Sequence, residues 1–313
     1  MSEMKKNDYL CSVIKQKHLI WQLQFLHSTL RVIYVGNEKK RLSLQCNKTK
    51  TFDMAITISS FNFKGGVGKT TTTVNLAKAL HSLGKRVLVI DADAQGNASK
   101  MMGFRLATEK DGKTLYEAMS GNASIMECVF CENENEESFD FIPSRPNLYQ
   151  CEQELVSRTG REYILRMMLN NLEDHYDFIL IDCPPNYGLV SINAMVASDY
   201  LLIPINCEVF ALDGMGLITA KYEEIKKLVN PELEILGYIM SRYDKRLSLH
   251  RQAYEQMNQN FPGKVFNTTI RTNIQLAESP AQRMNVFDFA PNCTGAADYM
   301  ELAKEILSRL DNQ

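Results

Sequence analysis

The chain has 313 residues, 45% of them hydrophobic and 23% charged, enough to bury a full core in one large or two small domains. Its formal net charge of −2 excludes a protein that binds nucleic acid through bulk positive charge, so any such contact must come from a local patch. The chain contains neither a run of 18 apolar residues nor a signal-peptide core, which predicts a cytoplasmic protein without a membrane span.

Residues 1–53 differ from the rest of the chain in charge. They carry ten basic and four acidic side chains, a net charge of +6, so the remaining 260 residues sum to −8. The segment has apolar stretches but few turn signals, and it ends where a strand-like run begins at Met54. We interpret 1–53 as a basic N-terminal extension and 54–313 as the main globular domain.

From Met54 onward the apolar pattern alternates between strands and helices. A β-branched run from Ala55 to Phe61 is followed by a glycine-rich loop and then by apolar residues at helical spacing, which end at Gly84 as a helix cap. Further buried strands are predicted at Arg86–Ile90, Phe178–Ile181, Tyr200–Ile205 and Ile235–Met240, with a helix at Gly214–Val229. Buried strands that alternate with helices predict an α/β fold with a doubly wound, mostly parallel sheet and helices on both faces.

One stretch within this domain is too polar for a core element. Residues Glu127 to Asp140 hold six acidic side chains and two asparagines, which predicts a solvated surface loop. Cys128 and Cys131 in this stretch have CxxC spacing, but no second pair or histidine cluster follows at the spacing of a zinc site. We therefore expect structural or incidental cysteines here.

The loop after the first strand predicts a phosphate site. It reads Lys64-Gly65-Gly66-Val67-Gly68-Lys69-Thr70-Thr71. A strand that feeds such a loop into a helix points backbone N–H groups and the helix N-terminus at one spot, as a di- or triphosphate requires. Lys69 would reach the β- and γ-phosphates, and the Thr70 hydroxyl is placed to coordinate magnesium. The common pattern G-x-x-x-x-G-K-[ST] fails at Phe63, so this is a variant loop with a second lysine, Lys64.

Carboxylates follow two further strands at the sheet edge where such folds bind their ligands. Asp91 and Asp93 follow the strand that ends at Ile90, and Asp182 follows the strand that ends at Ile181. Hydrolysis needs magnesium held by an acidic shell and a water aligned with the γ-phosphorus. After a phosphate loop, Asp93 and Asp182 suit these tasks, whereas alone such residues are more often turn or helix caps.

These motifs together resemble the ParA/MinD family of P-loop ATPases. Lys64 to Thr71, Asp91 to Asn97 and Ile181 to Pro185 look like its deviant Walker A, A′ and B motifs. Within that superfamily, the chain is similar to the ParA/Soj branch of plasmid and chromosome partition ATPases in Phe141-Ile142-Pro143-Ser144, Ile203-Pro204, Ile270 to Ile274 and Leu276 to Ser279. The resemblance covers nearly all of residues 54–313.

The resemblance implies a mechanism and a set of partners. Lys64 would cross the interface of an ATP-dependent homodimer to the partner's phosphates, Asp93 would position the attacking water, and Asp182 would hold the magnesium shell. ATP and Mg²⁺ are the implied cofactors of a slow hydrolysis that works as a switch. The ATP-bound dimer would bind DNA without sequence preference, associate with the nucleoid, and respond to a ParB-like centromere-binding protein.

The resemblance also implies where the adenine and the DNA lie. Ser241-Arg242-Tyr243-Asp244 is a looser match to the adenine segment, with Arg242 and Asp244 as candidate contacts. Scattered arginines are usually solvated surface, and the candidates for DNA contact are Arg242, Lys245, Arg246, Arg251, Arg271 and Arg283.

Three other readings stay open at this point. A MinD-like membrane-cycling ATPase needs a C-terminal amphipathic anchor, but the helical end from Tyr299 to Leu310 lacks a basic face and bulky aromatics, and its apolar stripe is expected to pack on the domain. A reductase like the nitrogenase iron protein needs cluster cysteines, and Cys183 stands too close to the phosphates for that role. A non-enzymatic adaptor with a dead site would be expected to lack Lys69, Thr70, Asp93 or Asp182.

Overall fold

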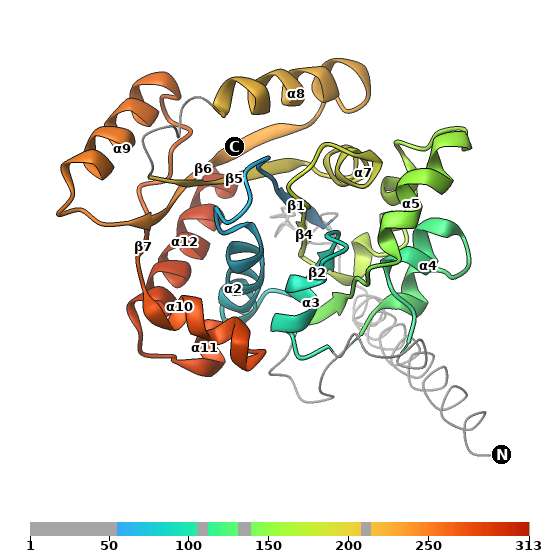
Figure 1. The fold of residues 1–313 in the computed structure, drawn as a ribbon, viewed down its shortest axis with the longest axis horizontal. Coiled ribbons are helices and arrows are strands. Elements are labelled where there is room, and N and C mark those ends of the chain that lie inside the picture. The colour runs from blue at the N-terminus through green and yellow to red at the C-terminus, as the bar shows by residue number, and fades with distance from the viewer. Residues whose placement is uncertain (1–54, 105–111, 131–138, 208–213, 313) are drawn as a thin grey trace, which may run out of the picture. The chain divides into compact units, whose positions relative to one another are not determined.

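The computed structural model describes residues 55–104, 112–130, 139–207 and 214–312. In this part of the chain, seven strands form one sheet in the order β3-β2-β4-β1-β5-β6-β7, and every neighbouring pair is parallel (Figure 1). The predicted parallel α/β sheet is confirmed. The strands are β1 (Ile56–Ser60), β2 (Val87–Asp91), β3 (Asp140–Ile142), β4 (Phe178–Asp182), β5 (Tyr200–Asn206), β6 (Glu234–Tyr243) and β7 (Ile270–Arg271).

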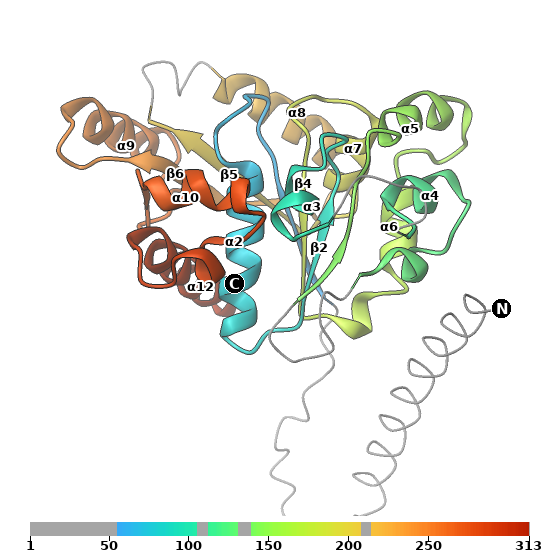
Figure 2. The ribbon, with the colours of Figure 1, turned by 60° about the horizontal axis from the view of Figure 1, so that its bottom comes forward.

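Helices cover both faces of the sheet, as the sequence predicts (Figures 1 and 2). One face carries α2 (Lys69–Ser82), α3 (Asn97–Met101), α10 (Ile274–Glu278), α11 (Val286–Phe289) and α12 (Thr294–Asp311). The other carries α4 (Leu115–Ser120), α5 (Leu148–Glu154), α6 (Ile164–Leu169), α7 (Leu189–Val196), α8 (Met215–Leu228) and α9 (Ser248–Asn260).

The strands β2 and β4 are apolar up to their last residue because both of their faces are buried. In β2, Val87 and Val89 belong to the core under α2 and α12, whereas Leu88 and Ile90 belong to the core under α4 to α8. A strand that is buried on both sides has no polar face to alternate with, so it reads as a continuous apolar run. This is why unbroken apolar runs in the sequence locate these strands.

Two short strands were not predicted from the sequence, and the prediction for one polar stretch is partly wrong. β3 and β7 span only three and two residues, too few for a pattern to mark them. The prediction of a solvated loop from Glu127 to Asp140 is wrong at both ends, because Cys128 is fully buried and Asp140 begins β3. Burial raises the pKa of the Cys128 thiol to about 12. Cys131 and residues 132–138 lie outside the described residues, as does the proposed extension 1–53.

The C-terminal helix α12 packs on the domain through its apolar stripe. Tyr299, Leu302, Ala303 and Ile306 are buried against α2, and the Tyr299 hydroxyl lies 3.2 Å from the Thr72 hydroxyl. The expected packing of this stripe is confirmed, which removes the apolar face that a lipid anchor of this helix would need. Among the helices of the described residues, none is both long and apolar enough to cross a membrane.

Candidate nucleotide-binding site

The register of three neighbouring strands brings the predicted site residues together. Ser60 at the end of β1 pairs with Asp182 at the end of β4, and Asp182 pairs in turn with Asp91 at the end of β2. The three loops that follow therefore start side by side at the carboxyl edge of the sheet. This is the edge where open α/β sheets bind their ligands.

The loop between β1 and α2 has the backbone of an anion site. Gly66 and Gly68 adopt φ angles of 74° and 96°, a left-handed conformation that strains any residue with a Cβ. Gly68 is also the N-cap of α2, whose first turn has no side-chain cap and no acidic residue. The first N–H groups of α2 have no partner within the helix, so they are available to an anion in front of it.

Lys69, the first residue of α2, is buried behind this loop. Its Nζ donates to the carbonyl oxygens of Asn62, at 2.9 Å, and of Lys64, at 3.2 Å. Burial lowers the pKa of Lys69, and the charges of Asp182 and Asp93 act in the opposite direction. The charges of the two predicted carboxylates thus favour the ammonium but do not offset the cost of its burial, which phosphate oxygens would reduce further.

Asp182 has the properties of a ligand for a hard cation. It is fully buried, and neither of its carboxylate oxygens makes a hydrogen bond of good geometry with any of the described residues. Burial and the charge of Asp91 raise its pKa well above the usual range, although the nearby Thr70 hydroxyl lowers it. Magnesium prefers oxygen ligands and keeps part of its water shell, so Thr70 and Asp182 fit the predicted magnesium site.

Asp91 and Asp93 differ in their hydrogen bonds. Asp91 accepts hydrogen bonds from the backbone N–H and the hydroxyl of Ser99, at 2.8 and 2.7 Å, and one from the Asp93 backbone at 3.1 Å. It therefore fixes the loop between β2 and α3. Among the described residues, the Asp93 Oδ1 accepts from the Gln95 backbone alone, at 2.9 Å, so this carboxylate keeps acceptor capacity. Its charge acts on both Lys69 and Asp182.

Asn62 holds the phosphate loop in place, a role that was missed in the sequence. Its Nδ2 donates to the Pro204 carbonyl of β5 at 2.8 Å, and its Oδ1 accepts from the Lys64 backbone at 2.9 Å. From the same strand, the Asn206 Nδ2 reaches the Gly66 carbonyl at 3.4 Å. A polar residue directly after a buried strand is the one signal that could have pointed to Asn62.

Lys64 and its neighbour Phe63 lie on the outer side of the loop. Lys64 is exposed, but both polar groups of its backbone form hydrogen bonds. Its N–H donates to the Asn62 side chain, and its carbonyl accepts from the Lys69 ammonium. Phe63, the residue that breaks the common motif, packs edge-on against Phe61 and lies 6.1 Å from the Tyr187 ring. The aromatic side chain at position 63 therefore anchors the loop on which Lys64 is presented.

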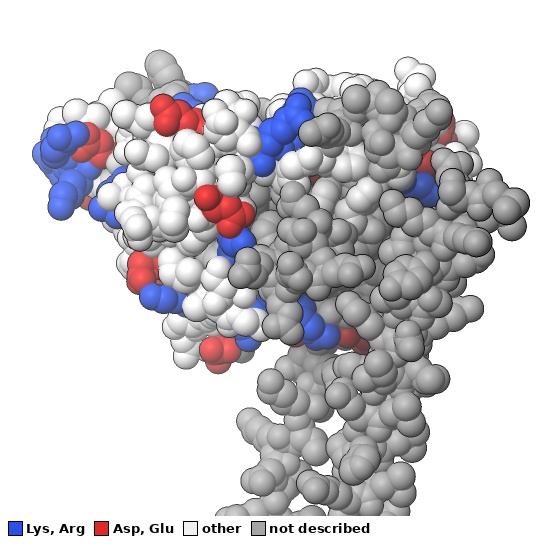
Figure 3. Space-filling view, turned by 90° about the horizontal axis from the view of Figure 1, so that it is seen from below, with Lys and Arg blue, Asp and Glu red and all other residues white. Residues whose placement is uncertain are grey.

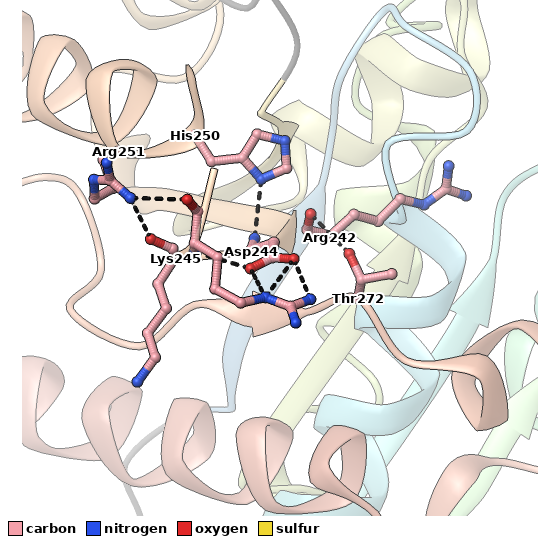
Figure 4. Close-up of polar contacts among 7 residues, drawn as sticks. Arg242, Asp244, Lys245, His250, Arg251 and Thr272 are labelled. Carbon is pink, nitrogen blue, oxygen red and sulfur yellow. Dashed lines mark hydrogen bonds and ion pairs between the residues drawn. The ribbon is translucent and has the colours of Figure 1, made fainter. Parts of the chain in front are cut away.

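The predicted adenine segment lies at the end of β6 (Figure 4). Arg242 adopts a φ angle of 52°, and its carbonyl accepts a hydrogen bond from the Thr272 hydroxyl at 3.1 Å. The Asp244 carboxylate binds the backbone and guanidinium of Arg246, and these bonds lower its pKa to about 2. The adenine roles of Arg242 and Asp244 stay predictions, and Asp244 would have to act while bound to Arg246.

A comparison with known proteins places this site in a family. A family model described as an AAA domain matches residues 55–235. The sporulation initiation inhibitor protein Soj of Bacillus subtilis is 37% identical over 249 residues, which cover 80% of this chain and 97% of Soj. The chromosome partitioning protein ParA of Caulobacter vibrioides is 37% identical over 250 residues, which cover 79% and 92%.

The chain belongs to the ParA/Soj family of P-loop partition ATPases. The fold agrees with solved structures. That of cobyrinic acid a,c-diamide synthase from Mycobacterium smegmatis, with bound ADP and magnesium, superposes with a TM-score of 0.71 at 26% identity, over 82% of this chain and 96% of that one. In this partition ATPase, the residues that match the family motifs are those gathered at the carboxyl edge of the sheet.

Replacing Asn62 should loosen the phosphate loop. Asn62→Ala removes both side-chain hydrogen bonds and leaves the Pro204 carbonyl unpaired, so we expect the free energy of unfolding to fall by about 1–3 kcal/mol. The affinity for ATP should fall as well. Denaturant unfolding and titration with a fluorescent ATP analogue measure the two effects. Asn260→Ala, at the end of α9, is the matched control. Equal ATP affinity in the two variants would show that Asn62 does not support the loop.

Replacing Asp182 should separate stability from ligand binding. Because the pKa of Asp182 is raised in the folded state, ionisation of this carboxyl destabilises the fold. The destabilisation is absent at pH values below the pKa of Asp182 in the unfolded chain, and it is complete at pH values above the raised pKa in the folded state. At neutral pH, Asp182→Asn should therefore raise the free energy of unfolding of the nucleotide-free protein by about 1–3 kcal/mol. The variant should also lose the stabilisation by Mg²⁺ and ATP that thermal melts detect in the wild type.

Asp91→Asn is the contrasting variant for this experiment. Asp91 is equally buried, and burial raises its pKa to about 6, but three hydrogen bonds to the two oxygens of its carboxylate oppose that shift. The NH₂ group of an asparagine would face at least one of these N–H donors, so replacing Asp91 should lower stability. A loss of stability in Asp182→Asn as large as that in Asp91→Asn would contradict the assignment of Asp182 as the carboxylate with unmet oxygens.

Proposed function

We propose that the protein hydrolyses ATP slowly, as the switch of a DNA partition system in the cytoplasm. Family membership supports this, and so does the fit of the site to a magnesium–nucleotide complex. When bound, magnesium would neutralise charge on the phosphates. Lys69 and the first turn of α2 bind the phosphates, Thr70 and Asp182 hold the metal, and Asp93 orients the attacking water and takes part in the metal shell.

We further propose that ATP joins two copies of the chain face to face. The observation that carries this step is the position of Lys64, whose side chain is exposed while its backbone is fastened to Asn62 and to the buried Lys69. A cation presented in this way can meet the phosphates of a second copy, as an arginine finger does in other phosphoryl-transfer enzymes. A ParB-like partner would then stimulate hydrolysis and release the dimer.

Variants of Lys64 and Asp93 test the switch. Lys64→Ala should keep its affinity for ATP within about threefold, since Lys69 remains, but lose ATP-dependent dimerisation and hydrolysis. Asp93→Ala should bind ATP and dimerise, with hydrolysis reduced by about a hundredfold or more because the water is no longer oriented. Light scattering with and without ATP measures the dimer, and phosphate release measures turnover. A Lys64→Ala protein that still dimerises with ATP would refute the proposed role.

DNA binding by the ATP-bound dimer is the third part of the proposal. Among the described residues in the view of Figure 3, Lys and Arg side chains form separate groups with Asp and Glu side chains between them. Arg246 is paired with Asp244, and the Arg271 Nε donates to the nearly buried Asp298 at 2.9 Å. The Arg251 guanidinium binds the carbonyls of Lys245 and Arg246, as Figure 4 shows. Arg242 and Arg283 are exposed, and both have positive φ angles.

These contacts predict different outcomes for two of the candidates. Lys245→Ala removes an exposed charge, so it should weaken DNA binding severalfold and reduce the salt slope by about one, with no change in thermal stability. Arg271→Ala should lower the melting temperature as well, because the Asp298 carboxylate loses its charged partner and keeps the hydrogen bond from the backbone N–H of residue 271. DNA titrations with ATP at several salt concentrations, beside Lys304→Ala on α12 as control, measure these effects. Equal DNA affinity with ATP, with ADP and without nucleotide would refute the switch.

A further inference from the structure

The short helix α5 contacts the loops that follow two strands of the site. The hydroxyl of Tyr149 in α5 accepts a hydrogen bond from the Gln95 Nε2 at 3.0 Å, and the Gln95 backbone is bound by Asp93. Three residues further along α5, Glu152 faces the start of α7, which follows the Asp182 loop. Residues three apart lie on the same side of a helix, so a single face of α5 serves both loops.

Glu152 supplies the cap that α7 lacks in its own sequence. The residue before α7 is Gly188, which has no side chain to cap the helix. Instead, the Glu152 Oε2 accepts from the Leu189 backbone at 2.6 Å, and Oε1 accepts from the Val190 backbone at 3.1 Å. A carboxylate at a helix N-terminus is stabilised by both the free N–H groups and the helix dipole.

The contact leaves no room for a side chain at position 188. A Cβ added to Gly188 would lie 2.3 Å from the Glu152 Oε1 and 2.6 Å from its Cδ. The glycine is needed here for close approach, since its φ angle of −104° is open to any residue. Glu152 and the start of α7 are therefore fitted to each other.

The segment that Glu152 holds also contacts the phosphate loop. Tyr187, the residue before Gly188, places its ring 6.1 Å from the ring of Phe63. The Lys221 ammonium of α8 lies 4.5 Å from the centre of the same Tyr187 ring. The Asn186 carbonyl accepts from the Ser191 hydroxyl at 2.7 Å. Both ends of the segment from Asp182 to α7 are thus fixed, one by the sheet and the other by Glu152.

We infer that Glu152 is a positioning residue of the nucleotide site. Glu152 caps α7 from the same face of α5 that carries Tyr149, which binds Gln95. It thereby fixes the position of the Asp182 loop relative to the Asp93 loop. This inference rests on the proposed ATPase function and adds a residue outside the family motifs quoted above. Among the described residues, the Glu152 carboxylate accepts hydrogen bonds from Leu189 and Val190, neither of which is assigned to the phosphates or the metal. Its loss should therefore affect turnover through the placement of Asp93 and Asp182.

The test compares turnover with nucleotide affinity in variants of α5. Glu152→Ala should lower kcat by about ten- to a hundredfold, the usual cost of losing a group that orients a site. Its affinity for a fluorescent ATP analogue should stay within about threefold of wild type, because the phosphate loop keeps its own hydrogen bonds to Asn62 and Lys69. Glu152→Gln keeps one acceptor oxygen, so its kcat should lie between those of the wild type and Glu152→Ala. Gln153→Ala, on the exposed side of α5, should have the kcat of the wild type.

Gly188→Ala tests the same contact from the other side. It should lower kcat when Glu152 is present, because the added methyl group displaces the carboxylate, and should have little further effect in Glu152→Ala. A kcat of Glu152→Ala within about twofold of wild type, a loss of affinity as large as the loss of kcat, or additive effects of the two changes would each overturn the inference.

Hydrogen exchange separates this inference from the proposed function. In Glu152→Ala, the amides of Leu189 and Val190 lose their acceptor and should exchange faster, and the peptide that contains Gln95 should follow through Tyr149. Unchanged exchange at Gln95 would overturn the coupling whether or not the protein turns over ATP. A wild-type protein without ATPase activity would overturn the proposed function instead.

Discussion

The parallel register of β1, β4 and β2 is the constraint on which the site depends. It places Ser60, Asp182 and Asp91 in one row at the carboxyl ends of the strands. Both faces of these strands are buried, so a slip of one residue would exchange the side chains of two packed cores. The hydrophobic packing of the sheet thereby fixes where the phosphate loop and the two acidic loops start, before any polar contact between them forms.

At that edge the nucleotide-free site carries opposite charges that the protein does not fully compensate. Burial lowers the pKa of Lys69 and raises that of Asp182, so each side chain is penalised in its charged form. Phosphate oxygens would complement the ammonium, and a divalent cation would complement the carboxylate. The fold thus gives up stability in the free state that a magnesium–nucleotide complex can return by binding.

Local patterns in the sequence were sufficient for much of the fold and the phosphate loop. A β-branched run marks β1, and apolar runs mark β2, β4, β5 and β6 because those strands are buried on both faces. In contrast, β3 and β7 are too short to leave a pattern. Asn62 and Glu152 were missed for a different reason. Their partners Pro204 and Leu189 lie 142 and 37 residues away in the chain, and only the folded sheet brings them into contact.

Lys64 and Lys69 show how one loop assigns opposite roles to the same residue type. They are five residues apart and share a hydrogen bond, from the Lys69 ammonium to the Lys64 carbonyl. Lys69 begins α2, so its side chain turns back into the buried space behind the loop. Lys64 follows Phe63, whose ring is held in an aromatic cluster, and its own side chain lies at the surface. In the proposed dimer, the buried lysine binds the nucleotide of its own chain, and the exposed lysine meets that of the second copy.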